Sequence, residues 1–277
     1  MKTMCRVLEV SKSGFYAWAK RPISQRAQTN ARLVHEIRTT YVENRKAYGS
    51  PRIHLALQKK GIVCGHNRVA RLMRVNYIIA QRQFRRRRHN VTAHGRNLVV
   101  NLVKRNFHVT RPNHIWASDI TVFWSGSGWL YLAVVMDLYS RRIVGWAMQK
   151  RMTDDLTINA LRMAVDQRLP QGGLIHHSDQ GSQYASDSFK RELTCHRITP
   201  SMSRKGDCYD NAVVESFFKT LKAEIPKEDR SKTRQETRSR IFEYIEVFYN
   251  RKRLHSTLGY KSPAEYERID LTKPSVH

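Results

Sequence analysis

Three acidic residues in the second half of the chain stand where a carboxylate needs a partner. Asp119 lies inside the β-rich stretch HIWASDITVFW, Asp179 directly follows the apolar run LIHHS, and Glu215 lies on a predicted helix over residues 210–223. A carboxylate among apolar neighbours is costly unless it is hydrogen-bonded, paired with a cation or bound to a metal ion. Each has an ordinary explanation: a turn cap for Asp119, bonds to backbone amides for Asp179, and an ion pair along the helix for Glu215. Taken singly, none of the three identifies a catalytic site.

The predicted helix over residues 210–223 carries two stripes of side chains. Its apolar stripe, spaced for burial against a core, comprises Val214, Phe217, Phe218 and Leu221. Glu215, Lys219 and Lys222 form a second stripe with the spacing i, i+4, i+7, roughly 100° around the helix from the first. One carboxylate and two ammonium groups therefore project together from the edge of the buried face.

The elements that must position these carboxylates form an α/β pattern. From residue 113 onward, three apolar runs separated by turns at 125–128 and 137–141 predict a three-stranded antiparallel meander. Further elements are predicted as a helix near 154–168, a short buried strand in LIHHS, a helix near 186–194, a strand in RITPSMS, and helices over 210–223 and 234–249. Strands followed by alternating helices and strands indicate a mixed sheet with helices packed on it.

The first 82 residues are predicted to be a helical region that binds DNA. Residues 32–46 have helical spacing, and SPRIHLALQKKG suits a helix with Ser50 as N-cap and Pro51 in its first turn. A further helix over 67–76 follows, with Val69, Leu72 and Met73 on its apolar side and Arg68, Arg71 and Arg74 on the other. Two short helices joined by a tight turn predict a helix-turn-helix at about 50–76 whose arginines contact DNA. A generic helical hairpin with solvated arginines is the alternative.

A basic segment without apolar periodicity separates the two regions. The stretch QFRRRRHNVTAHGRN at residues 83–97 contains four arginines in a row, Arg85, Arg86, Arg87 and Arg88. Like charges extend a chain by repulsion, so this segment either lies along phosphates or is only a solvated connector. The expected organisation is a helical region at 1–82, a basic linker at 83–112, an α/β core at 113–268 and a tail at 269–277.

The charge is distributed unevenly along a chain of formal net charge +27. Residues 1–112 hold 25 Lys and Arg against 3 Asp and Glu, whereas residues 113–277 hold 25 against 20. Such a basic first part favours binding of a polyanion, and nucleic acid is preferred over a membrane surface because no basic amphipathic helix is evident. No apolar run approaches the roughly 20 residues of a membrane span, and the N-terminus is not a signal peptide. Four cysteines are too few for a disulfide framework, so a cytoplasmic protein is expected.

The order and spacing of these motifs resemble a known family. There are 35 residues between Asp179 and Glu215, and Lys222 lies seven positions beyond the glutamate. This spacing is similar to the D, D-35-E signature of transposases with a retroviral-integrase-like core. The stretches HHSDQGSQY, SMSRKGDCYDNAVVESFFKTLKAE, YNRKRLHSTLGYKSPAEYE, VSKSGFYAWAKRP and YGSPRIHLALQKKGI resemble the second-frame (OrfB) transposases of the bacterial insertion-sequence three family. The resemblance covers nearly the whole chain.

The resemblance implies an RNase H-like core, a mixed five-stranded sheet flanked by helices, with Asp119, Asp179 and Glu215 as catalytic metal ligands. It further implies two Mg²⁺ ions per site, with Mn²⁺ as a substitute, and DNA cleavage followed by strand transfer. Lys219 and Lys222 are then expected to contact DNA phosphates. The implied partners are double-stranded DNA (terminal repeats and target), further copies of the chain, and an upstream-frame protein (OrfA), either fused to the chain or separate. The implied location is the bacterial cytoplasm, with the protein associated with the nucleoid.

Two other functions remain open at this point. One is a DNA-binding regulator whose catalytic centre is silent, and the other is a nuclease for RNA–DNA hybrids. Among further residues, Asp137 is expected to be structural and to pair with the turn at Arg141 and Arg142. The side chains of His176 and His177 either position DNA or water, or pack in the core. The cysteines and histidines lack the spacing of a zinc site.

Overall fold

The computed structural model describes residues 2–81, 99–103, 109–203, 211–225 and 233–271. The chain divides into two compact units, an N-terminal unit over Met1–Ala80 and a C-terminal unit over Gln81–His277. The predicted basic linker lies largely outside the described residues, and so do Arg85, Arg86, Arg87 and Arg88. In the part of the chain that is described, no helix combines the length and apolar character that crossing a membrane requires.

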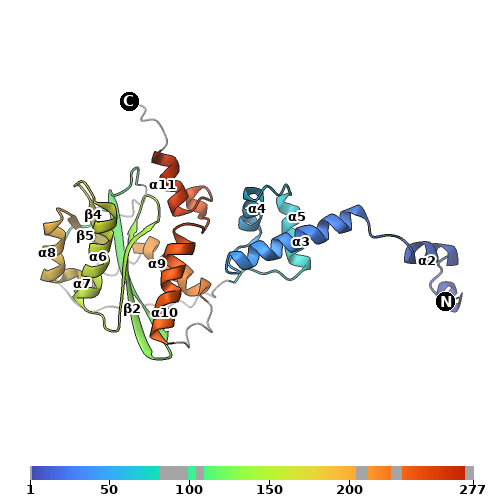
Figure 1. The fold of residues 1–277 in the computed structure, drawn as a ribbon, viewed down its shortest axis with the longest axis horizontal. Helices are drawn as coiled ribbons and strands as arrows, with labels where there is room; N and C mark the ends of the chain where they lie inside the picture. The colour runs from blue at the N-terminus through green and yellow to red at the C-terminus, as the bar shows by residue number, and fades with distance from the viewer. Residues whose placement is uncertain (1, 82–98, 104–108, 204–210, 226–232, 272–277) are drawn as a thin grey trace. The chain divides into compact units, whose positions relative to one another are not determined.

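The N-terminal unit consists of helices. They are α1 (Lys2–Val7), α2 (Lys12–Ala19), α3 (Gln25–Glu43), α4 (Ser50–Lys59) and α5 (His66–Val75), as Figure 1 shows. The last three pack on one another around a small apolar core of Leu33, Ile37, Ile53, Leu57, Val69, Leu72 and Met73. The predicted helix-turn-helix region is therefore present as α4 and α5.

Two helix starts in this unit differ from the sequence expectation. Helix α3 begins at Gln25, well before residue 32, because the Ser24 side chain accepts a hydrogen bond from the N–H of Ala27 and caps the helix. Ser50 was expected as an N-cap but is the first residue of α4, and Gly49 occupies the cap position without a side-chain bond.

The C-terminal unit is built on a five-stranded sheet. Its strands are β1 (Ile115–Ser125), β2 (Gly128–Asp137), β3 (Ile143–Gln149), β4 (Ile175–Ser178) and β5 (Thr199–Met202), in the order β3-β2-β1-β4-β5. The first three strands form the predicted antiparallel meander, while β4 and β5 run parallel to β1. The mixed five-stranded sheet expected of an RNase H-like core is thus confirmed.

Helices cover both faces of this sheet (Figure 1). One face carries α6 (Asp154–Arg168), α7 (Ser182–Ala185) and α8 (Asp187–Cys195), and the other carries α9 (Ala212–Glu224) and α10 (Arg234–Phe242). Helix α10 continues into the π-helical segment η3 (Glu243–Tyr249), and α11 (Pro263–Leu271) follows. Helix α6 approaches β3 so closely that a Cβ on Gly145 would lie 2.2 Å from the carbonyl oxygen of Ala160. Only glycine fits there, which fixes α6 against the sheet.

Two groups of buried charges hold the C-terminal helices in place. Arg168 at the end of α6 pairs with Asp137 at 3.1 Å and with Glu267 of α11. Arg253 pairs with Glu224 of α9 at 2.7 Å, and the Tyr244 hydroxyl donates to the same carboxylate. Asp137 is therefore structural and does pair with the turn at 141–142, as expected: its backbone N–H donates to the carbonyl oxygen of Arg142 at 2.9 Å and its carbonyl oxygen accepts from the Arg141 N–H at 2.8 Å. The sequence did not reveal its ion pair with Arg168.

Candidate active site

The two aspartates are brought together by the pairing of β1 with β4. The parallel register sets Trp116 opposite His176 and Ala117 opposite His177. Extending this register by two residues sets Asp119 level with Asp179, and neighbouring strands lie about 4.8 Å apart. Asp119 is half-buried inside the central strand, whereas Asp179 is exposed just after β4 ends. Both expected positions, the first strand and the end of the fourth, are confirmed.

Glu215 reaches the same region from the first turn of α9, which packs against β1. Val214, Phe217, Phe218 and Leu221 are buried, so the predicted apolar stripe fixes the rotation of this helix. A contact that the sequence did not reveal fixes its start: the Asn211 amide donates to the carbonyl oxygen of Ser118 at 3.0 Å. Because Ser118 precedes Asp119, Asn211 ties the helix that carries Glu215 directly to the strand that carries Asp119.

The three carboxylates act on one another electrostatically. Burial, together with the negative charges of Asp179 and Glu215, raises the pKa of Asp119 to about 7. The Ile120 N–H and the Lys222 ammonium act in the opposite direction. Desolvation of the Asp179 carboxylate by the surrounding protein raises its pKa, and the negative charge of Glu215 adds to the rise. The hydrogen bond from the Gly181 N–H lowers it. The site thus collects negative charge with only partial compensation.

Each carboxylate also has a hydrogen bond that orients it. Asp119 accepts from the N–H of Ile120 at 2.7 Å and Asp179 from the N–H of Gly181 at 3.0 Å. Glu215 accepts from the Lys219 ammonium at 3.3 Å, an ion pair that is exposed to solvent. Within the described ranges, no three His, Cys, Asp or Glu side chains lie close enough to hold one metal ion in common. The three carboxylates therefore interact electrostatically, but their oxygens do not surround one common point.

The two lysines of α9 lie differently. Lys222 is half-buried, with its ammonium 5.4 Å from the centre of the Phe123 ring on β1, and it lowers the pKa of Asp119. Lys219 is exposed and pairs with Glu215. The sequence stripe of Glu215, Lys219 and Lys222 therefore does lie on one side of the helix, at the carboxylates.

The two histidines before Asp179 are buried parts of the scaffold. His176 shares a hydrogen bond of 2.7 Å with Ser118, and His177 shares one of 2.9 Å with Ser201. Burial lowers the pKa of His176 to about 3, so its ring is neutral near pH 7. Of the two expectations left open, packing in the core is the one confirmed, and these bonds hold β4 between β1 and β5.

Tyr184, which shares the stretch HHSDQGSQY with Asp179, has a hydroxyl on which both aspartates act electrostatically. It is buried, and no partner for its hydroxyl lies among the described residues. Burial raises its pKa well above the usual value, and the charges of Asp119 and Asp179 add to the rise. The hydroxyl is therefore a neutral hydrogen-bond donor close to both aspartates. The sequence places Tyr184 five positions after Asp179, but it does not show that the Tyr184 side chain is buried.

The predicted DNA-contacting arginines of α5 are not equivalent. Arg71 and Arg74 are exposed as expected. Arg68 instead donates to the side chains of Asn30 at 2.9 Å and Thr29 at 3.0 Å, which holds α5 against α3. Part of the arginine face is thus used within the unit, because α3 begins early enough to bring Thr29 and Asn30 alongside.

Family models match three parts of the chain. One described as an HTH-like domain matches residues 28–88, and two described as integrase core domains match residues 109–208 and 215–271. The chain is 42% identical to the insertion element IS600 uncharacterized 31 kDa protein of Shigella sonnei, over 95% of this chain and 97% of that protein. It is 39% identical to the transposase InsF for insertion sequence IS3A of Escherichia coli, over 98% of this chain and 95% of that protein.

Solved structures of viral integrases are more distant. The simian T-cell lymphotropic virus intasome in complex with a PP2A regulatory subunit aligns at 18% identity and a TM-score of 0.48, covering 81% of this chain and 72% of that chain. The HTLV-2 integrase catalytic core domain in complex with magnesium aligns at 19% identity and a TM-score of 0.41, covering 58% and 99%.

Proposed function

Because the chain belongs to the insertion-sequence three family of transposases with an integrase-type core, we propose that Asp119, Asp179 and Glu215 form its catalytic triad. The enzyme is a polynucleotidyl transferase of the transposase/integrase type. The observation that carries the proposal is the convergence of negative charge: Asp179 and Glu215 both raise the pKa of Asp119. A structural role offers no benefit for collecting three carboxylates, whereas a cation-binding site requires it.

The donor set fits divalent magnesium. All three side chains offer carboxylate oxygens, the hard ligands that Mg²⁺ prefers, and each ion needs only one or two of them because water and substrate phosphate complete its shell. Asp119 would hold both of two ions, and Asp179 and Glu215 would hold one each. When bound, two Mg²⁺ ions, or Mn²⁺ in their place, stabilise the attacking and leaving oxygens of an in-line displacement at phosphorus.

The residues around the triad have supporting tasks in this proposal. Asn211 and Ser118 keep the start of α9 against β1, so that Glu215 stays beside Asp119. The Lys222 ammonium, already next to the carboxylates, contacts a DNA phosphate near the scissile bond, and Lys219 changes from Glu215 to a phosphate when the glutamate is recruited. Glu215 is available for this change because its pair with Lys219 is exposed and therefore weak.

The reaction has two displacements of the same kind. Water first attacks the phosphodiester at the end of the element and releases a DNA 3′-OH. That 3′-OH then attacks a phosphodiester of the target, so that one phosphodiester bond forms as another breaks and a 3′-OH of the target strand leaves. The first step consumes one phosphodiester bond by hydrolysis, the second conserves their number, and neither needs a covalent protein intermediate. The partners are double-stranded DNA, recognised in part through the helix-turn-helix, and further copies of the chain that bring two ends together. An upstream-frame protein is a further proposed partner, and the reaction takes place in the bacterial cytoplasm.

A strand-transfer assay tests the proposal. Purified chain is incubated with a labelled duplex of the element end, a supercoiled target plasmid and Mg²⁺, and nicked and joined products are separated on a gel. End-specific nicking and joining is the expected result. Binding without any nicking would instead support the silent regulator, and degradation of RNA–DNA hybrids without joining would support the nuclease.

A further inference from the structure

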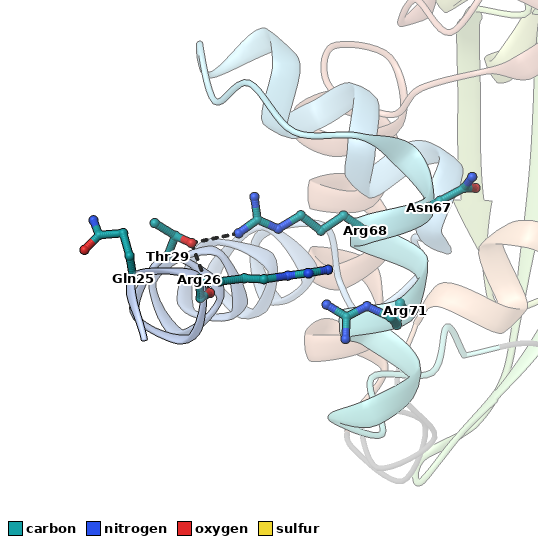
Figure 2. A pocket seen from close by; sticks show the side chains of 6 residues that line it. All are labelled: Gln25, Arg26, Thr29, Asn67, Arg68 and Arg71. Atoms are coloured by element: carbon teal, nitrogen blue, oxygen red, sulfur yellow. Dashed lines mark hydrogen bonds between the residues drawn. The ribbon is translucent and has the colours of Figure 1, made fainter. Parts of the chain in front are cut away.

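The N-terminal unit contains a hollow that is lined by basic and amide side chains. It has a volume of about 570 Å³ and lies between the first turns of α3 and the first half of α5. Figure 2 shows its lining residues, Gln25, Arg26, Thr29, Asn67, Arg68 and Arg71. Of the described residues, three arginines line it with their guanidinium groups and none of its lining residues carries a carboxylate. We call it the arginine pocket.

Two of the arginines point at each other across this pocket. Arg26 extends from α3 toward α5, and Arg71 extends from α5 toward α3 (Figure 2). Both side chains belong to exposed residues that could turn toward solvent. Two positive groups that face one hollow repel each other, and an anion between them removes that repulsion. Residues 1–80 contain 16 Lys and Arg but only 3 Asp and Glu, so the unit itself has few anions to supply.

The third arginine, Arg68, is held between the two helices. Arg68 donates through Nε to Asn30 and through one terminal nitrogen to Thr29, and the Thr29 hydroxyl donates to the carbonyl oxygen of Arg26. These bonds link the backbone at Arg26 to the guanidinium of Arg68, so the Arg68 guanidinium is held in place before any ligand arrives. A pre-organised planar guanidinium suits the oxygens of a phosphate group.

The position of the pocket indicates which phosphate it takes. Asn67 and Arg68 lie in the first turn of α5, the second helix of the helix-turn-helix, whose N-terminal residues face base edges in this motif. The hollow is larger than one phosphate needs and leaves room for the adjoining sugars. We propose that the arginine pocket binds one backbone phosphate of double-stranded DNA, at the edge of the groove that α5 enters. This inference rests on the proposed DNA-binding role of the helix-turn-helix but not on the catalytic triad.

The test measures DNA affinity against salt concentration. Full-length Asp119→Asn protein, used to prevent cleavage, is titrated into a labelled element-end duplex and a scrambled duplex by fluorescence anisotropy. Adding Arg26→Gln and Arg71→Gln together should lower the magnitude of the slope of log K against log [salt] by about 0.9, the value for one phosphate. Affinity should fall about 10-fold on both duplexes, since two charge-assisted hydrogen-bond donors are removed.

A matched variant controls for charge alone. Arg38→Gln removes one exposed arginine from the same helix α3, 12 residues beyond Arg26 and about 18 Å away along the axis. The slope should change far less in Arg38→Gln than in Arg26→Gln alone, and thermal melts should show all variants folded. An equal effect of Arg38→Gln, an unchanged slope in the double variant, or a loss confined to the element-end duplex would each overturn the proposal.

Inorganic phosphate provides the second arm. At constant ionic strength, millimolar phosphate should compete weakly or not at all, because a backbone phosphate is held by neighbouring contacts as well. Competition at micromolar phosphate would identify a free anion as the ligand and overturn the assignment to DNA. Failure of the triad is distinguishable: a chain that cuts no DNA but shows the predicted slope change would retain the pocket and lose the proposed catalysis.

Discussion

The C-terminal unit places carboxylates in two kinds of surroundings: some are paired with arginines and stabilise the fold, and others lie beside further carboxylates at the proposed active site. Glu224 and Asp137 are buried opposite Arg253 and Arg168, so each charge is compensated within the protein. Asp119 instead faces two further carboxylates, which raise its pKa together with burial. Compensated charges can support a fold, whereas collected like charges weaken it until a ligand of opposite sign is bound. The arginine pocket of the N-terminal unit likewise collects like charges, but these charges are positive.

The largest expected effect is on catalysis at the carboxylate cluster. Replacing Asp119 or Asp179 by Asn, or Glu215 by Gln, should each reduce strand cleavage by about 10³-fold or more, equivalent to about 4 kcal/mol of barrier. DNA binding should persist, because the folded site is not disrupted. Cleavage and anisotropy assays measure the two properties. Asp187→Asn, an exposed carboxylate on α8, is the matched control and should cut normally. Full activity in any of the three variants would remove that residue from the site.

Breaking a compensated pair should affect stability. Arg253→Met leaves the buried Glu224 carboxylate without its ionic partner, which should cost about 3–5 kcal/mol of unfolding free energy. Arg162→Met is the control, because Arg162 pairs with Glu192 at an exposed site, where such a pair is worth about 1 kcal/mol or less. Urea denaturation monitored by tryptophan fluorescence compares the two. Equal losses would mean that burial does not distinguish these ion pairs.

The carboxylate cluster should make metal-free stability depend on pH. The folded pKa of Asp119 is about 7, above its ordinary value of 3.8, so protonation favours the fold. This stabilisation is complete below pH 4 and is lost as pH rises through 7. Asp119→Asn should therefore be more stable than wild type in EDTA, with a difference that grows from near zero at pH 4 to about 3–4 kcal/mol at pH 8. A difference independent of pH would contradict the raised pKa.

The smallest effect is expected at the contact that positions Glu215. Asn211→Ala leaves the Ser118 carbonyl without its donor, a loss of about 1–3 kcal/mol. If Asn211 holds Glu215 in place for the cation, the Mg²⁺ concentration for half-maximal cleavage should rise. A lower melting temperature with unchanged Mg²⁺ dependence would reduce Asn211 to a purely structural residue.

The parts of the fold that depend on local signals were predictable. Helix α6 runs from Asp154 to Arg168 as expected, because helical spacing of Leu156, Leu161 and Val165 ends before Pro170 and a glycine pair. The strand before Asp179 and the apolar stripe around Glu215 were predictable for the same reason, so the carboxylates could be assigned to their elements.

The contacts between distant residues were not predictable. Asn211 bonds to Ser118 across 93 positions, and Arg68 bonds to Asn30 across 38. Nothing in the local pattern of either residue specifies its partner, since many polar residues could meet at that distance. Asp137 shows the same limit, because its contacts with the nearby turn at Arg141 and Arg142 were predictable, whereas Arg168 approaches only when α6 packs on the sheet.

The central claim is that Asp119 binds the catalytic cation, and a change of ligand atom tests it most directly. Asp119→Cys replaces a hard oxygen by a softer thiolate, which binds Mg²⁺ poorly and transition metals well. Cleavage of the element end should be lost in Mg²⁺ and recovered at least about 10-fold in Mn²⁺, while wild type cuts in both and Asp119→Asn in neither. Wild-type activity of the Asp119→Cys protein in Mg²⁺, or no recovery in Mn²⁺ by a folded, DNA-binding Asp119→Cys protein, would contradict the account.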